Sequence, residues 1–224
     1  VPGKGVFRIF ADGGLEILQR GGKIVDGLPE DGAHHARLEG RIAQVPPGPE
    51  RGLRVTDVAR VAFRAALALD VRDQFLLAAY ADFLLDQGRP AEVIALLRDW
   101  VRSDILLLRL ALAEKALDAP AAKEHIQALK ARFDAAALRG DKLHQQEEAR
   151  FNLYLLGQKE KALALARENW KLQREPRDAR MLLEAALAMN DSGAGKDALE
   201  WLERSGHEDP GLRRTAEKLK ALRR

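Results

Sequence analysis

Residues 73–100 read DQFLLAAYADFLLDQGRPAEVIALLRDW, and this stretch predicts two short helices folded back on each other. Apolar side chains recur at helical spacing in its first half, and Asp73 can accept hydrogen bonds from the free amides of the first turn. Gly88 tolerates the left-handed conformation that often ends a helix, and Pro90 suits the first turn of the next one. We therefore expect one helix from Asp73 to about Gly88 and a second helix that begins at Pro90.

The same layout recurs further along the chain. Residues 178–193, DARMLLEAALAMNDSG, repeat the order of an aspartate, a Leu-Leu pair and a glycine fifteen residues after the aspartate. A lone pair of amphipathic helices cannot bury both of its apolar stripes, so the recurrence favours stacked helical pairs. Aspartates expected to cap helices recur at separations of 31, 37, 37 and 31 residues: Asp73, Asp104, Asp141, Asp178 and Asp209.

This pattern resembles the tetratricopeptide-repeat (TPR) family, whose motif is a helical hairpin of about 34 residues. The best-matching segment is residues 147–176, EEARFNLYLLGQKEKALALARENWKLQREP. Its turn at Gly157, its small residues Ala162 and Ala166 and its closing Pro176 look like the small-residue pattern of the family. The segment is similar to those of bacterial TPR-like helical repeat proteins.

The chain also departs from the family pattern. Leu77 and Gln146 stand where a large aromatic residue is usual early in the first helix, and the small residue one turn later is Ala81 in one repeat but Arg150 in another. The resemblance implies an all-α fold, in which residues 53–224 form a right-handed α-solenoid of TPR-like helical hairpins with a C-terminal capping helix. It implies little about function, because the family is a scaffold for many recognition tasks.

Residues 1–52 differ in kind from the rest and hold more than half of the 18 glycines and 9 prolines of the chain. Residues 6–10 and 15–19 are short runs separated by Ala-Asp-Gly-Gly, which favours a small β-hairpin. A third strand is expected through residues 23–25. The Pro-Pro-Gly-Pro of residues 46–49 cannot be helical, so a linker and domain boundary are expected there.

Further helices are expected on either side of the opening pair. Residues 56–69 predict a single helix with Thr56 as its cap, residues 104–117 a deeply buried helix, and residues 142–156 the first helix of the best-matching repeat. A long helix should run from Pro120 to about residue 138. The stripe expected to be buried in the helix of residues 56–69 is Val58, Val61, Ala62, Ala65 and Leu69. The buried face expected in a last helix, after Asp209, is Leu212, Ala216, Leu219 and Leu222.

The TPR resemblance implies a non-catalytic scaffold that binds a protein or peptide partner in a concave groove lined by the first helix of each pair. Mixed charge with two aromatic residues suits a polypeptide ligand. For Phe151 and Tyr154, core packing between neighbouring repeats is slightly favoured over partner contact. Trp100 and Trp170 should be structural, since they recur at matching helix ends. The residues placed in the groove by spacing are Asp82, Asp86, Lys115, His144, Glu147, Phe151, Tyr154, Arg180 and Asn190.

No catalytic, cofactor or metal site is expected. The chain has no cysteine, and the Gly13-Gly14 pair lacks the helix start and lysine of a nucleotide-binding loop. His34 and His35 have no further ligand nearby. His144 lies one turn from Glu147, but the second histidine of a zinc-protease motif is missing, so a hydrated helix surface is the simpler interpretation.

Composition limits the classes of partner. The chain is 46% hydrophobic and 32% charged, and its 37 basic and 34 acidic residues are too evenly balanced to indicate a nucleic-acid partner. No apolar run approaches the length of a membrane span. As an alternative to binding a partner in the groove, the scaffold would self-associate through one end of the repeat array.

The start of the chain at Val1, without a signal peptide, indicates a processed or truncated protein of the cytoplasm or periplasm. An export signal or another domain could have preceded Val1. The alternative function is therefore a regulatory or accessory repeat domain of a larger enzyme or ligand-binding protein.

Overall fold

The computed structural model describes residues 6–9, 15–18, 55–67, 73–141 and 144–222. The chain divides into two compact units, Val1–Leu76 and Leu77–Arg224, and each is described by itself. The boundary predicted at residue 52 lies outside the described residues and stays a prediction.

The first unit contains two short strands, β1 (Val6–Ile9) and β2 (Leu15–Leu18). They pair antiparallel, with Val6 opposite Leu18 and Ile9 opposite Leu15. Because residues 10–14 lie outside the described residues, the hairpin turn stays a prediction. The same holds for the third strand at residues 23–25 and for the linker at residues 46–49.

Helix α2 (Val55–Leu67) follows in the first unit. It begins one residue before Thr56, so the prediction that Thr56 caps this helix is wrong. The predicted buried stripe is also wrong: Val61 is 49% exposed and Ala65 is exposed, whereas Phe63 is buried. Val58 and Ala62 are half-buried, and Leu69 lies outside the described residues. Apolar residues occupy several faces of this helix, so periodicity alone could not select the buried face.

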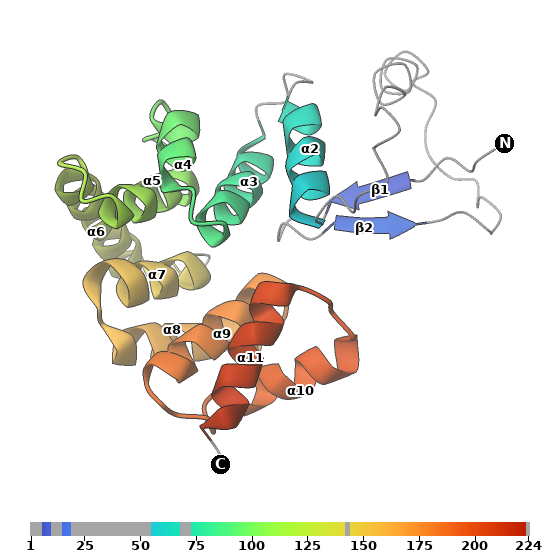
Figure 1. Ribbon diagram of the computed structural model, residues 1–224. Coiled ribbons are helices and arrows are strands. Elements are labelled where there is room, and N and C mark those ends of the chain that lie inside the picture. The colour runs from blue at the N-terminus through green and yellow to red at the C-terminus, as the bar shows by residue number, and fades with distance from the viewer. Residues whose placement is uncertain (1–5, 10–14, 19–54, 68–72, 142–143, 223–224) are drawn as a thin grey trace, which may run out of the picture. The chain divides into compact units, whose positions relative to one another are not determined.

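From residue 77 onward the described chain is helical (Figure 1). The pairs follow one another as α3 (Gln74–Asp86) with α4 (Pro90–Leu97), and α5 (Asp104–Ala116) with α6 (Ala122–Leu138). Next comes α7 (Gln145–Phe151), which continues into the π-helical stretch η1 (Asn152–Leu156) before α8 (Lys159–Leu172). The last three helices are α9 (Pro176–Ala188), α10 (Lys196–Ser205) and α11 (Pro210–Ala221).

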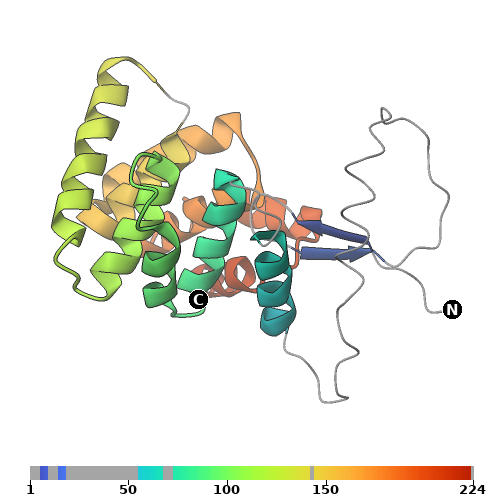
Figure 2. The same ribbon diagram turned by 90° about the horizontal axis from the view of Figure 1, so that it is seen from above.

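Neighbouring helices of this unit pack on each other. Helix α5 contacts α4 and α6, α8 contacts α7 and α9, and α9 also contacts α10 and α11 (Figure 1, and from above in Figure 2). The predicted deep burial of residues 104–117 is confirmed for α5, whose buried side chains run from Leu106 to Glu114, although Leu117 is 49% exposed.

The first helix of each pair ends at a residue with positive φ. These residues are Gly88 (φ +66°), Asp118 (φ +51°), Gly157 (φ +70°) and Asn190 (φ +54°). Gly193 lies in the turn between α9 and α10, as predicted, but the residue that takes the left-handed conformation after α9 is Asn190. Asparagine is among the few residues besides glycine that adopt this conformation readily, so the equivalence is physical even though the residue type differs.

The series of capping aspartates is confirmed at two positions. The backbone amide of Phe75 donates to Asp73 Oδ1 at 2.7 Å, and that of Leu212 donates to Asp209 Oδ1 at 2.6 Å. Pro90 stands at the start of α4, as predicted. These contacts satisfy amides that a helix start leaves without an intrahelical acceptor.

The other three aspartates have different places. Asp104 follows the cap position, Ser103, and pairs with Arg132 at 2.6 Å. Asp178 lies at the third helical position of α9 and accepts a hydrogen bond from the backbone amide of Glu175. Asp141 does not cap α7, because that helix begins only at Gln145. A regular aspartate spacing therefore does not mean a regular capping role.

The C-terminal helices enclose a hydrophobic core, called here the C-terminal core, which is drawn from α7 to α11. Of the small residues that carry the TPR resemblance, Ala166 lies in this core and Ala162 is also buried. Trp170 is also buried and meets Trp201 edge-on at 5.9 Å. The equivalence predicted for Trp100 is wrong, because α4 ends at Leu97 and Trp100 lies in the following turn.

The last helix closes this core. Leu212, Ala216 and Leu219 of α11 are buried as predicted, whereas Leu222 is 43% exposed because the helix ends at Ala221. Gly195 lets α11 approach closely: a Cβ atom there would lie 2.4 Å from Leu219 Cδ2.

Candidate functional site

Charged side chains from the first helices of the pairs meet on one face of the second unit. The centre of this cluster is Arg109 of α5, whose side chain is only 5% exposed and lies in the middle of the apolar run of residues 105–113. Burying a guanidinium is costly unless carboxylates accept its hydrogen bonds. The neighbouring helices supply these carboxylates.

Arg109 binds one carboxylate on each side. Its Nη2 donates to Oδ2 of Asp82 on α3 at 2.9 Å, and its Nη1 donates to Oε1 of Glu147 on α7 at 3.0 Å. Nη1 also donates to the carbonyl of Ile105 at 3.0 Å, one turn earlier on α5. One side chain therefore joins three helices that are far apart in sequence.

Asp82 accepts from a second guanidinium. Arg150 Nη1 of α7 donates to Asp82 Oδ1 at 2.7 Å, across 68 residues of sequence. Burial alone would raise the pKa of Asp82, but Arg109 and Arg150 outweigh it and lower the pKa to about 2. Burial lowers the pKa of Arg109 itself, and its two carboxylates more than reverse this. Asp82 and Arg109 are therefore both charged at neutral pH.

A second set of contacts lies beside the first. Arg180 of α9 makes two hydrogen bonds to Asp86 of α3, Nη1 to Oδ2 at 2.7 Å and Nη2 to Oδ1 at 2.6 Å. Its Nε donates to Glu184 at 2.8 Å, one turn later on α9. Burial and the Glu184 carboxylate, which accepts a hydrogen bond from the Tyr154 hydroxyl, raise the pKa of Tyr154. Tyr154 is nevertheless 42% exposed.

Among these contacts, six residues form ion pairs between different helices, and we call them the charged seam. Beside the seam, Lys115 Nζ of α5 donates to the backbone carbonyls of Tyr154 and Leu155, at 2.8 and 3.0 Å. These carbonyls lie at the end of η1, where a helix leaves acceptors unsatisfied. The seam is made of Asp82, Asp86, Arg109, Glu147, Arg150 and Arg180.

The residues predicted for a groove fall into three groups. Asp82, Asp86, Glu147 and Arg180 belong to the charged seam, with Lys115 and Tyr154 beside it. Phe151 is 2% exposed and packs against Phe133 of α6 at 5.2 Å, so core packing is its role. His144 and Asn190 are exposed at the start of α7 and after the end of α9.

Sequence reasoning missed three members of this arrangement: Arg109, Arg150 and Glu184. One signal pointed to Arg109, which is the lone basic residue in the run ILLLRLALA of α5. A charge in the middle of a helix that is apolar all round must find partners on its neighbours. Arg150 was noted only as a departure from the small-residue pattern, and nothing in the sequence marked Glu184.

The described residues contain no group of three or more His, Cys, Asp or Glu side chains placed to hold a metal ion. His34 and His35 lie outside them. Glu148 pairs with Lys161 at 2.9 Å, and His125 Nδ1 lies 2.7 Å from Glu114 Oε2. A hollow of about 120 Å³ lies among α6, α7, η1 and α8.

The helices that the structure describes include none of the length and apolar character needed to cross a membrane. Searches of protein-family models, of curated proteins and of solved structures each found no match to this chain.

Proposed function

We propose that this protein is a non-catalytic TPR-like scaffold that mediates protein–protein interaction. In this proposal the paired helices form a right-handed α-solenoid, and α3, α5, α7 and α9 line its inner face. The observation that carries the proposal is that charged side chains of these four helices contact one another from pair to pair. Such a common face is where repeat arrays of this kind present a binding surface.

The buried part of the seam and its exposed edge have different roles in this proposal. Arg109 and Glu147 are too buried to meet a partner, and they fix how the helices sit against each other. Tyr154 is 42% exposed, and Asp86 and Arg180 are each about one-third exposed. An exposed tyrosine beside polar groups is a typical anchor for a polypeptide. We therefore assign partner contact to Tyr154, Asp86 and Arg180, with His144 and Asn190 at the margins.

The test begins with proximity labelling or affinity capture on the intact protein, followed by affinity measurements on the purified pair. Tyr154→Ala should weaken binding about tenfold or more, as loss of a central aromatic anchor does. Leu172→Ala is the matched control, because Leu172 is 67% exposed on α8, a second helix. If Tyr154→Ala binds like the unmodified protein, or if Leu172→Ala weakens binding equally, the inner face is not the binding surface.

A further inference from the structure

The C-terminal core does not include the first helix of the second unit. Its buried residues come from α8, α9, α10 and α11, with Ala149 of α7 and Ala194 between α9 and α10, and no described residue of α3 belongs to it. Helix α9 therefore obtains its apolar contacts within the C-terminal part of the chain. Its connection to α3 is of another kind.

That connection is the ion pair of Asp86 and Arg180, which are separated by 94 residues. Both nitrogens at the end of the guanidinium bind the carboxylate, which is the strongest geometry for such a pair. Glu184 holds Nε of Arg180 from the same helix and so fixes the direction in which the guanidinium points. The pair is thus well oriented although it has no apolar packing from the C-terminal core on its α3 side.

Solvent reaches this pair more easily than the rest of the charged seam. The side chains of Asp86 and Arg180 are 33% and 30% exposed, whereas those of Arg109 and Glu147 are 5% and 9% exposed. Salt screens exposed charges far more than buried ones. The Asp86–Arg180 pair should therefore be the first contact of the seam to open, while Arg109 keeps α3, α5 and α7 together.

We propose that Asp86 and Arg180 form an ionic latch that holds α9 against α3, and that its release lets α9 and the two helices after it, α10 and α11, move away from α3. The buried contacts of Arg109 with Asp82 and Glu147 are the fixed side of this movement. Opening the latch also makes Glu184 and Tyr154 more accessible. Only this last consequence, access of a partner to Tyr154, rests on the proposed function.

The experiment measures the distance between the end of α3 and the start of α9 in the full chain without any partner. The chain has no cysteine, so Gln87→Cys and Gln173→Cys create two defined attachment sites, both at exposed positions, for a pair of fluorescent dyes. At low salt we expect one population with a short dye-to-dye distance. Arg180→Gln should raise the ratio of open to closed molecules about tenfold, as should Asp86→Asn. About 1 M NaCl should shift the unmodified chain in the same direction.

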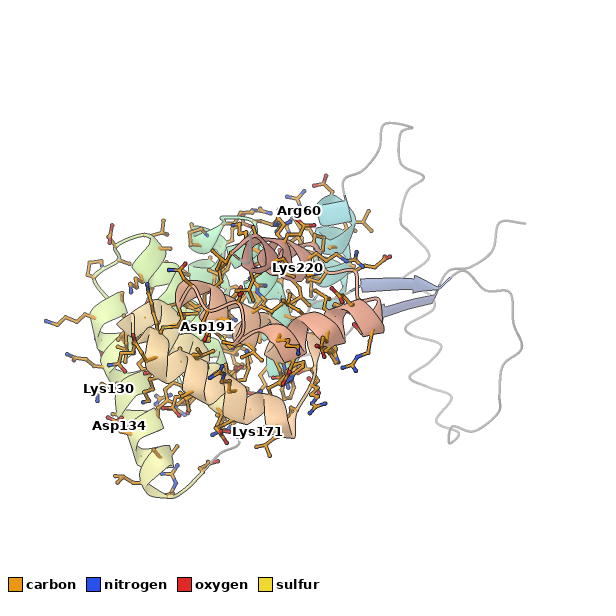
Figure 3. All side chains as sticks on the ribbon, turned by 90° about the horizontal axis from the view of Figure 1, so that it is seen from below. Arg60, Lys130, Asp134, Lys171, Asp191 and Lys220 are labelled. Atoms are coloured by element: carbon orange, nitrogen blue, oxygen red, sulfur yellow. The ribbon has the colours of Figure 1, made fainter. Side chains whose placement is uncertain are left out.

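The double variant gives the internal check. If the two residues act as one latch, Asp86→Asn combined with Arg180→Gln opens the chain no further than either change alone. The matched control is Lys130→Gln, which removes the exposed pair of Lys130 with Asp134 on α6 (Figure 3) and should leave the distances unchanged. Helicity from circular dichroism identifies folded variants.

The latch is ruled out if both single variants keep the short distance at every salt concentration, or if Lys130→Gln opens the chain as much. Neither result bears on the scaffold proposal, because no partner is present in the measurement. Conversely, a Tyr154→Ala variant with full partner affinity would refute the assigned binding surface and leave the latch intact.

Discussion

Arg109 and Glu147, 38 residues apart in sequence, form a buried ion pair with 3.0 Å between Nη1 and Oε1. Such a pair adds little net stability, because removing both charges from water costs about as much as their attraction returns. Its effect is on specificity, since a guanidinium buried on α5 is satisfied only when α3 and α7 bring their carboxylates to it. The relative placement of the three first helices is therefore set by polar contacts as well as by apolar packing.

The first prediction concerns the removal of this guanidinium. Arg109→Met should lower the free energy of unfolding by about 3–5 kcal/mol, because Glu147 would remain buried without its partner and Asp82 would keep only Arg150. Chemical denaturation at pH 7 measures the change. Lys130→Ala removes an exposed pair on α6 and should cost less than about 1 kcal/mol. Equal effects of the two substitutions would show that Arg109 is not a buried structural charge.

The second prediction concerns pH. The pKa of Asp82 is lowered to about 2 in the folded chain, so Asp82 contributes stability above its unfolded pKa of about 4. That contribution, about 2 kcal/mol, is lost as the pH falls from about 4 towards 2, while Arg109, whose pKa is raised, stays charged. The difference in unfolding free energy between the unmodified chain and Asp82→Asn should shrink by this amount over that range. A difference in unfolding free energy that stays constant over this pH range would mean that the two arginines do not lower the pKa of Asp82.

The third prediction concerns the close approach of α11 to the C-terminal core. Gly195→Ala should destabilise the chain by about 1–3 kcal/mol, because the new methyl group would overlap the side chain of Leu219. Gly193→Ala is the control, since its nearest described atom is the carboxylate oxygen of Asp191 at 3.2 Å. Thermal unfolding of the two variants under the same conditions compares their losses of stability. A neutral Gly195→Ala would mean that α11 packs less closely than described.

The fourth prediction separates a true helix cap from an aspartate that only resembles one in sequence. Asp209→Ala should cost about 1 kcal/mol, because it removes the acceptor of the Leu212 amide. Asp104→Ala should cost less, because Asp104 makes an exposed ion pair with Arg132 in place of a cap. Urea denaturation of both variants is the measurement, and the reverse order of the two effects would contradict the assignment.

Much of the helical architecture could be predicted from local sequence. The Asp73 cap, the left-handed Gly88 and Pro90 each act on adjacent backbone groups, so the ends of α3 and α4 follow from the residues themselves. The deep burial of α5 was likewise predictable from its composition. Predictions based on spacing between distant positions were less reliable. The left-handed residue after α9 is Asn190 and not Gly193. Asp178 is not the cap of α9 but its third residue, and it accepts a hydrogen bond from the amide of Glu175.

The charged seam could be predicted only in part. Spacing brought Asp82, Asp86, Glu147 and Arg180 to one face, but it could not show that they pair with one another. Those pairs join residues up to 94 positions apart, and their geometry depends on how the helices pack. Phe151 shows the same difficulty, since a helix position alone does not distinguish a ring in the core from a ring that meets a partner.

The central claim is that charged contacts couple first helices that are distant in sequence. It is tested most directly by a double-mutant cycle between Asp82 and Arg150. These residues are 68 positions apart in sequence, and Arg150 Nη1 lies 2.7 Å from Asp82 Oδ1. The unfolding free energies of Asp82→Asn, Arg150→Gln and the double variant should give a coupling energy of about 1 kcal/mol or more. Additive effects, within about 0.3 kcal/mol, would contradict the claim that α3 and α7 are held together by these side chains.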